Sequence, residues 1–120
     1  MSRAARGRLG YHAGLSAEAI VEQDYLRRGY SLAQRRYRGP GGEIDLIVRG
    51  RDSVIFVEVK ASKTHAQAAA RVSARQAARI QTSASAFVAN EPAGQLTDMR
   101  FDVALVDASG AIEILENAFM

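Results

Sequence analysis

The fold is decided by two runs of sequence, GGEIDLIV at residues 41–48 and VIFVEVK at residues 54–60. Both runs are rich in β-branched and aromatic residues, and glycine or polar turn residues bound each of them. This pattern is typical of two strands joined as a β-hairpin. Three carboxylates and a lysine nevertheless lie inside the runs, where strands normally carry apolar side chains. The hairpin is therefore a candidate for chemistry as well as for structure.

The alternation of side chains along a strand groups these charges. Successive side chains point to opposite faces of a sheet, so Glu43, Asp45 and Ile47 share one face, and Glu58 and Lys60 share a face of the second run. Like charges on neighbouring strands cost up to about 1 kcal/mol per pair. Compensation can come from the lysine alone, as in a solvated, salt-bridged face, or from a hard divalent cation. The pattern by itself leaves both readings open.

Two hairpin turns keep Asp45 and Glu58 on the same side of the sheet. A four-residue loop at 49–52 places Asp45 opposite Phe56 and diagonal to Glu58. A two-residue loop at 51–52 places Asp45 directly opposite Glu58. We favour the longer loop, because Arg-Asp is poor chemistry for the primed turns that two-residue hairpins prefer.

The segments Gly42–Ile47 and Phe56–Lys60 together resemble the PD-(D/E)XK nuclease superfamily. Within it the chain looks like the YraN-like bacterial family, which is related in fold to Holliday-junction resolvases, over residues 14–119. Ile44 stands where the superfamily name has proline. The resemblance implies an α/β fold, a single-domain restriction-endonuclease-like core with a mixed β-sheet flanked by helices. The implied order is α-β-β-β-α-β with a short extra C-terminal strand.

The resemblance also implies roles for the charged residues. Asp45, Glu58 and the backbone carbonyl of Val59 would bind Mg²⁺ or Mn²⁺, and Lys60 would orient a water or stabilise transition-state charge. Related nucleases often add a carboxylate from the first helix, which here would be Glu18 or Glu22. The spacing of the chain leaves the choice between these two open, and acids near a helix N-terminus also have a purely structural explanation.

The remaining elements follow from periodicity and turn signals. We expect helices at residues 16–28, capped by Ser16, and 73–89, with strands at 30–37, 100–106 and 111–115 and a loop at 61–72. The stripe Ile20, Val21, Tyr25 and Leu26 should be the buried side of the first helix. The match to the family at residues 100–103 is interpreted as a structural strand, in which Asp102 is either a partner of the metal-binding residues or a core-edge partner.

Length and composition predict one domain at residues 14–120, preceded by a flexible basic arm at residues 1–13. The chain has 120 residues, no cysteine and no run of apolar residues long enough to span a membrane, so we expect a cytoplasmic protein without disulfides or thiolate metal sites. The net charge of +3 combines a basic front half with an acidic tail. This distribution predicts one phosphate-binding side.

Basic residues on two segments are candidates for that side. Arg35, Arg36 and Arg38 are interleaved with Tyr37, a pattern suited to a nucleic-acid backbone and its exposed bases. On the second helix, Ser73 and Gln76 form a capping box, and arginines recur at 71, 75 and 79. In related nucleases this helix lends a polar or basic residue to the site, a pattern that Gln76 and Arg79 resemble. Arg75, Gln76 and Arg79 are also candidates to bind nucleic acid.

The leading hypothesis is therefore a Mg²⁺- or Mn²⁺-dependent endonuclease that hydrolyses phosphodiester bonds in nucleic acid, in particular DNA, with a Holliday-junction-resolvase-like activity that would favour a homodimer. The alternative is a non-catalytic DNA- or RNA-binding module that retains the nuclease fold. A third reading is a structural protein whose charged hairpin is a partner surface. Asp45, Glu58 and Lys60 together favour the first hypothesis, because binding alone would not require these three residue types.

Overall fold

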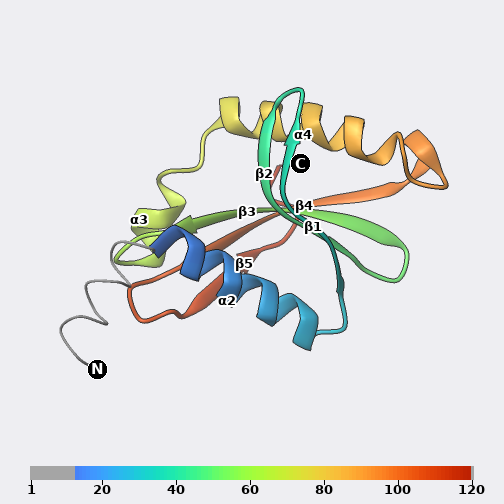
Figure 1. Cartoon of the computed structure of the whole chain (residues 1–120). Helices are drawn as coiled ribbons and strands as arrows, with labels where there is room; N and C mark the ends of the chain where they lie inside the picture. The colour runs from blue at the N-terminus through green and yellow to red at the C-terminus, as the bar shows by residue number, and fades with distance from the viewer. Residues whose placement is uncertain (1–12, 120) are drawn as a thin grey trace.

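A computed structural model describes residues 13–119 of the chain, and its side chains from Ala17 on (Figure 1). The predicted basic arm at residues 1–13 lies outside this range except for its last residue, at which the first described helix begins. Among the described residues, no helix is long and apolar enough to cross a membrane.

A five-stranded mixed sheet forms the centre of the fold. The elements in chain order are α2 (Ala13–Arg27), β1 (Ser31–Gly39), β2 (Gly42–Arg49), β3 (Ser53–Ala61), α3 (His65–Ala69), α4 (Ala74–Val88), the 3₁₀ turn η1 (Gly94–Leu96), β4 (Asp98–Val106) and β5 (Ile112–Leu115). The strands lie side by side in sequence order, with β3 and β4 parallel and the other pairs antiparallel. The predicted α/β class and element order are confirmed, whereas the short helix α3 occupies part of the predicted loop at 61–72.

The two long helices cover opposite faces of this sheet (Figure 1). Val21 and Tyr25 of α2 pack against Leu46, Val48, Ile55 and Val57 on one face. On the other face, Ile80, Ala84 and Val88 of α4 pack against Ile44, Ile47 and Phe56. Strand β3 is therefore buried on both sides, which explains why its sequence is a nearly continuous apolar run. The carboxylate of Glu58 interrupts that run.

The boundaries of the first helix differ from the prediction. Helix α2 begins at Ala13, so Ser16 lies inside the helix and does not cap it. The helix ends as predicted before Gly29, which has a φ of +97° that glycine adopts without strain. Leu26, predicted to be buried, is 36% exposed, and the apolar stripe is completed instead by Ala17.

The hairpin between β2 and β3 has the shorter of the two loops considered above. Leu46 pairs with Val57 and Arg49 with Val54, and the Gly50 N–H donates to the Ser53 carbonyl over 2.9 Å. The preference for a four-residue loop was therefore wrong. Neither Arg51 nor Asp52 has a positive φ, so the turn is not one of the primed types whose residue preferences argued against it.

The tip of the β1–β2 hairpin is fastened to α4 (Figure 1). Ser83 Oγ accepts the Gly41 N–H over 3.0 Å and donates to the Gly42 carbonyl over 2.7 Å. A Cβ atom at Gly41 would collide with the backbone carbonyl of Arg79, so glycine is required for this approach. This contact draws the far ends of β1 and β2 toward α4 and away from β3.

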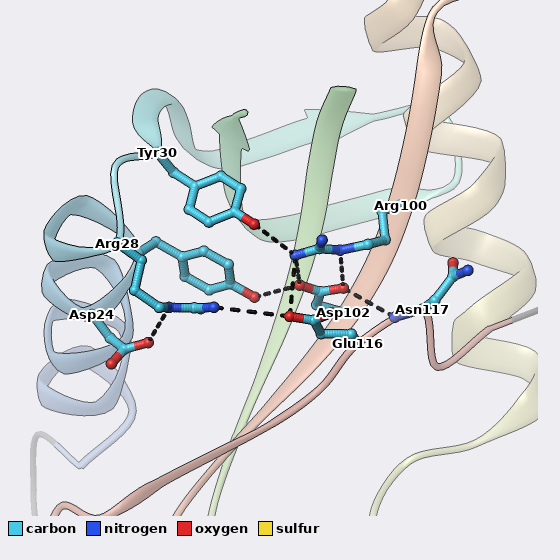
Figure 2. A network of polar contacts seen from close by, with 8 residues as sticks. Asp24, Arg28, Tyr30, Arg100, Asp102, Glu116 and Asn117 are labelled. Carbon is cyan, nitrogen blue, oxygen red and sulfur yellow. Dashed lines mark hydrogen bonds and ion pairs between the residues drawn. The ribbon is translucent and has the colours of Figure 1, made fainter. Parts of the chain in front are cut away.

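A second polar anchor lies on the α2 side, around the fully buried carboxylate of Asp102 in β4 (Figure 2). It accepts four hydrogen bonds: one from the Tyr25 hydroxyl at 2.6 Å, two from the Arg100 guanidinium at 2.9 Å, and one from the Asn117 N–H at 3.0 Å. Burial and the bond to Asp102 raise the pKa of Tyr25 far above its ordinary value. The network ties α2, β4 and the C-terminal segment together, as expected of a structural Asp102.

Removal of the Asp102 charge should destabilise the fold strongly. Asp102→Asn leaves the Arg100 guanidinium beside a neutral group, and breaking a buried ion pair costs roughly 3–5 kcal/mol. Tyr25→Phe removes a single hydrogen bond to a charged group and should cost roughly 1.5–3 kcal/mol. Urea unfolding of both variants measures these losses. Asp24→Asn, which breaks an exposed pair with Arg28, is the matched control, with an expected loss below about 1 kcal/mol. Equal stability of wild type and Asp102→Asn would contradict the structural role.

Candidate active site

The candidate site lies where β2 and β3 separate. Their pairing ends at Leu46 and Val57, beyond which β2 continues beside β1 toward α4, while β3 continues beside β4 to Ala61. The next residues in this register are Asp45 and Glu58, which therefore face each other at the point of separation. We call this place the fork, defined by Asp45 on β2 and residues 58–61 on β3.

Asp45 takes over the hydrogen bond that β2 no longer provides. Its Oδ2 atom accepts the Val59 N–H over 2.8 Å. The N–H and C=O groups of one strand residue point to the same edge, so the Val59 carbonyl also faces the fork. The predicted combination of Asp45, Glu58, Lys60 and the Val59 carbonyl is thus brought together by the end of the β2–β3 ladder.

Strict alternation of side chains fails in β2 at this point. Ile44 and Ile47 both pack on the α4 side, whereas Leu46 packs against α2 and Asp45 lines a hollow beside α2. The prediction that Asp45 shares a face with Ile47 was therefore wrong. The neighbouring strand is irregular at the same level, because Arg36, which lies between the partners of Ile44 and Leu46, has a φ of +50°.

The unusual backbone of Arg36 directs two consecutive arginines toward α2. Arg35 binds Glu22 through two hydrogen bonds of 2.6 and 2.8 Å, and Arg36 binds Glu18 over 3.2 Å. A left-handed backbone conformation is rare for residues other than Gly, Asn and Asp. These pairs, with Asp45, line a hollow of about 240 Å³.

Glu18 and Glu22, between which the sequence left the choice open, lie in different electrostatic environments. The bidentate bond from Arg35 lowers the pKa of Glu22, as expected of a permanently paired carboxylate. The pKa of Glu18 is instead raised, first by partial burial and then by the negative charge of Asp45. Glu18 is therefore the acid of α2 that is coupled to the fork, and Glu22 braces Arg35.

Glu58 is held in a position that disfavours its charge. The residue is 6% exposed, and its pKa is raised to about 9, mainly by burial and then by the adjoining Asp45 carboxylate. Lys60 acts in the opposite direction, with its Nζ atom 3.9 Å from Glu58 Oε1. The single ammonium group of Lys60 thus offsets only part of the cost of ionising Glu58 beside Asp45.

The donor atoms at the fork suit a hard divalent cation. Asp45 and Glu58 offer carboxylate oxygens and Val59 offers a carbonyl oxygen, the ligand types preferred by Mg²⁺ and Mn²⁺. Within residues 13–119, no group of three or more His, Cys, Asp or Glu residues is arranged to hold a metal ion. The residues therefore fit a cation that keeps several waters, with Glu18 at the margin of the site.

The residues predicted to bind nucleic acid lie on β1 and on α4 and do not form one cluster. The side chain of Arg38 is 88% exposed and its Nε atom lies 3.8 Å from Glu43, while Arg75 and Arg79 are exposed on α4. The N-terminus of α4 is capped as predicted, because Ser73 Oγ accepts the Gln76 N–H over 3.1 Å. That cap accounts for the backbone of Gln76 without a functional role.

Sequence reasoning placed Arg71 on a helical stripe with Arg75 and Arg79, which the structure contradicts. Helix α4 begins at Ala74, and Arg71 turns back to donate from Nη1 to the Ala61 carbonyl over 2.9 Å. Arg71 therefore lies at the end of β3, next to the fork. The four-residue spacing of Arg71 from Arg75 and Arg79 was a false helical signal, because Arg71 lies before the start of the helix.

Replacement of Glu58 by glutamine should stabilise the metal-free protein at alkaline pH. Because the pKa of Glu58 is raised on folding, its protonated form stabilises the folded protein fully below pH 4.5, the ordinary pKa of the group. This contribution to the free energy of unfolding is lost as pH rises toward 9, where the buried group must ionise beside Asp45. Glu58→Gln escapes that loss and should be more stable than wild type at pH 8 by on the order of 1–3 kcal/mol. Urea unfolding in EDTA at about pH 5 and 8 tests this, and the difference should shrink at the lower pH.

The exposed Glu43→Gln, on the same hairpin, is the control and should change stability by less than about 0.5 kcal/mol at either pH. A Glu58→Gln protein less stable than wild type at pH 8 would show that the carboxylate supports the fold, which would remove the electrostatic argument for a functional site.

The chain is similar to known proteins over nearly its whole length. Residues 17–106 match the family described as "Uncharacterised protein family UPF0102". A UPF0102 protein of Roseobacter denitrificans is 56% identical over 117 residues, covering 98% of this chain and 91% of its own. One of Ruegeria pomeroyi is 57% identical over 116 residues (97% and 94%), and one of Cereibacter sphaeroides 59% identical over 113 (94% and 97%). The chain that builds this fork is thus a member of the UPF0102 family, the YraN-like family that its hairpin motif resembles.

Proposed function

We propose that this protein is a divalent-metal-dependent nuclease of the PD-(D/E)XK superfamily, which hydrolyses phosphodiester bonds in nucleic acid, in particular DNA. One observation carries the proposal: Asp45, Glu58 and Lys60 converge where β2 and β3 separate, and they do so at an electrostatic cost to the fold. Strained electrostatics of this kind cluster at functional sites. The resemblance of the hairpin to the superfamily supports the same assignment.

Each residue at the fork has a role that its geometry supports. Asp45, Glu58 and the Val59 carbonyl would hold Mg²⁺ or Mn²⁺, which when bound polarises a phosphate and lowers the pKa of a water. The Val59 N–H fixes one Asp45 oxygen and leaves the other free to act as a ligand. Lys60 lies on the same strand two residues from Glu58, so its ammonium can orient a water or stabilise negative charge.

Charged residues outside the fork have roles in this proposal as well. Glu18 can extend the ligand set from α2, whereas Glu22 keeps Arg35 in place. The exposed Arg38, Arg75 and Arg79 are suited to contact phosphates on either side. A resolvase-like specificity for four-way junctions, with a homodimer as the active form, is the finer version that the family resemblance favours.

A second candidate function, nucleic-acid binding without catalysis, is favoured by a single observation. Both acids of α2 that could complete a metal shell are occupied by arginines, Glu18 by Arg36 and Glu22 by Arg35. The combination of Glu58 and Lys60 has no evident use in such a module. Metal binding separates the two candidates.

Substitution at the fork should separate metal binding from cleavage. Asp45→Ala should abolish Mg²⁺ and Mn²⁺ binding and any cleavage, because it removes a ligand and the anchor of Val59. Lys60→Ala should keep or strengthen metal binding, since the nearby positive charge repels a cation, yet lose cleavage by about 100-fold or more. Calorimetry with each ion and a cleavage assay on linear, flapped and four-way-junction DNA measure both properties.

Melting curves serve as the control for folding, with Arg51→Ala on the far end of the hairpin as a neutral reference. Metal binding by wild type without cleavage of any substrate would favour a regulatory or binding role. The nuclease assignment fails if wild type binds neither ion, with or without DNA. If Asp45→Ala unfolds the protein, the carboxylate is a structural partner of Val59 and the ligand assignment is wrong.

A further inference from the structure

The free edge of β3 can be followed residue by residue beyond the point where β2 leaves it. The Ser62 N–H donates to the Val106 carbonyl of β4 over 3.1 Å. Because the backbone groups of successive strand residues point to alternate edges, those of Val59 and Ala61 face the opposite edge, where the fork lies. Asp45 occupies the Val59 N–H, and Arg71 occupies the Ala61 carbonyl. The two side chains therefore meet the same edge two residues apart, a distance along the strand of about 7 Å.

Arg71 differs in its charge balance from Arg35 and Arg36, the two arginines that face α2. Arg35 and Arg36 are each paired with a glutamate of α2. No carboxylate within residues 13–119 lies within ion-pair distance of Arg71, which is exposed and uses one N–H to reach Ala61. A guanidinium has five N–H donors, so most of those on Arg71 remain available to a ligand. A fixed, uncompensated cation at this place is suited to a phosphate.

We propose that Arg71 binds a backbone phosphate of the nucleic acid beside the fork. This inference rests on the proposed function, and it adds to it one phosphate-binding residue and the direction in which the bound strand runs across the site. The hydrogen bond to Ala61 holds the guanidinium at the free edge of β3, one residue beyond Lys60. From there the exposed Arg75 follows on the first turn of α4. The bound strand thus passes Lys60, meets Arg71 and continues toward the start of α4.

The competing explanation is that Arg71 is a structural strut that satisfies the Ala61 carbonyl and fixes the segment between β3 and α4. A strut needs a hydrogen-bond donor, and its loss changes stability. A phosphate ligand needs a positive charge, and its loss changes the dependence of binding on salt. The two explanations therefore predict changes in different measurements.

The experiment measures binding of a fluorescein-labelled oligo(dT) of about 20 nucleotides, and of a duplex of equal length, by fluorescence anisotropy in EDTA, between about 50 and 200 mM NaCl. Arg71→Ala should weaken binding roughly tenfold at the lower salt concentration and reduce the slope of log affinity against log salt by about 0.7–0.9. Arg71→Lys should retain most of the slope, because it keeps the charge. Arg51→Ala, an exposed arginine at the other end of the β2–β3 hairpin, should match wild type.

Melting temperatures of all variants complete the test. If Arg71→Ala and Arg71→Lys lower the melting temperature but leave the salt slope at the wild-type value, Arg71 is a strut and the inference is overturned, while the nuclease proposal stands. If Arg71→Ala binds like Arg51→Ala and wild type, the inference is likewise overturned on its own. Absence of binding by wild type at the lowest salt concentration would overturn the proposed function and the inference together.

Discussion

The hydrogen bond from the Val59 N–H to the Asp45 carboxylate holds the site together, because it joins two strands whose own pairing has ended. A strand that loses its neighbour leaves backbone groups without partners, and such groups are costly when they are partly buried. A side chain from the departing strand meets that requirement here. The same contact fixes the direction of the Asp45 carboxylate and places it against Glu58. The hydrogen bond that satisfies the Val59 N–H therefore also sets the geometry of the charged cluster.

The separation of the strands is accompanied by a contact between the β1–β2 hairpin and α4. Ser83 binds the Gly41 N–H and the Gly42 carbonyl at the tip of the β1–β2 hairpin. Gly41 permits this approach because it lacks a Cβ atom. The far end of β2 is therefore held by α4 and cannot follow β3. The bend is accommodated at Asp45 and Leu46, whose side chains both turn toward α2, and at Arg36 in the adjoining strand. A contact between a helix and a turn thus helps to shape the site at the fork.

The strands, the long helices and the membership of Asp45, Glu58 and Lys60 in one cluster could be predicted from the sequence, because hydrophobic periodicity and turn residues are local signals. The register of the hairpin could not, since it depends on the conformation that Arg51 and Asp52 adopt, and their residue types argued for another turn. Simple alternation also failed at Asp45, because a tertiary contact with α4 bends the strand there. Arg71 was misplaced for a related reason: its partner, Ala61, lies ten residues earlier, on the other side of a segment that contains α3.

Asp102 and Glu58 are both buried acids, but their surroundings differ in the number of partners that stabilise the charged form. Asp102 receives four hydrogen bonds and a full positive charge, so its ionised form is satisfied and it strengthens the fold (Figure 2). Glu58 is nearly as buried, yet it lies against another carboxylate, and a single lysine at 3.9 Å offsets the repulsion. A valine at position 58 would have continued the apolar run of β3. That the chain instead keeps an acid whose ionisation is unfavourable without a further positive charge is the physical reason to look for a cation there.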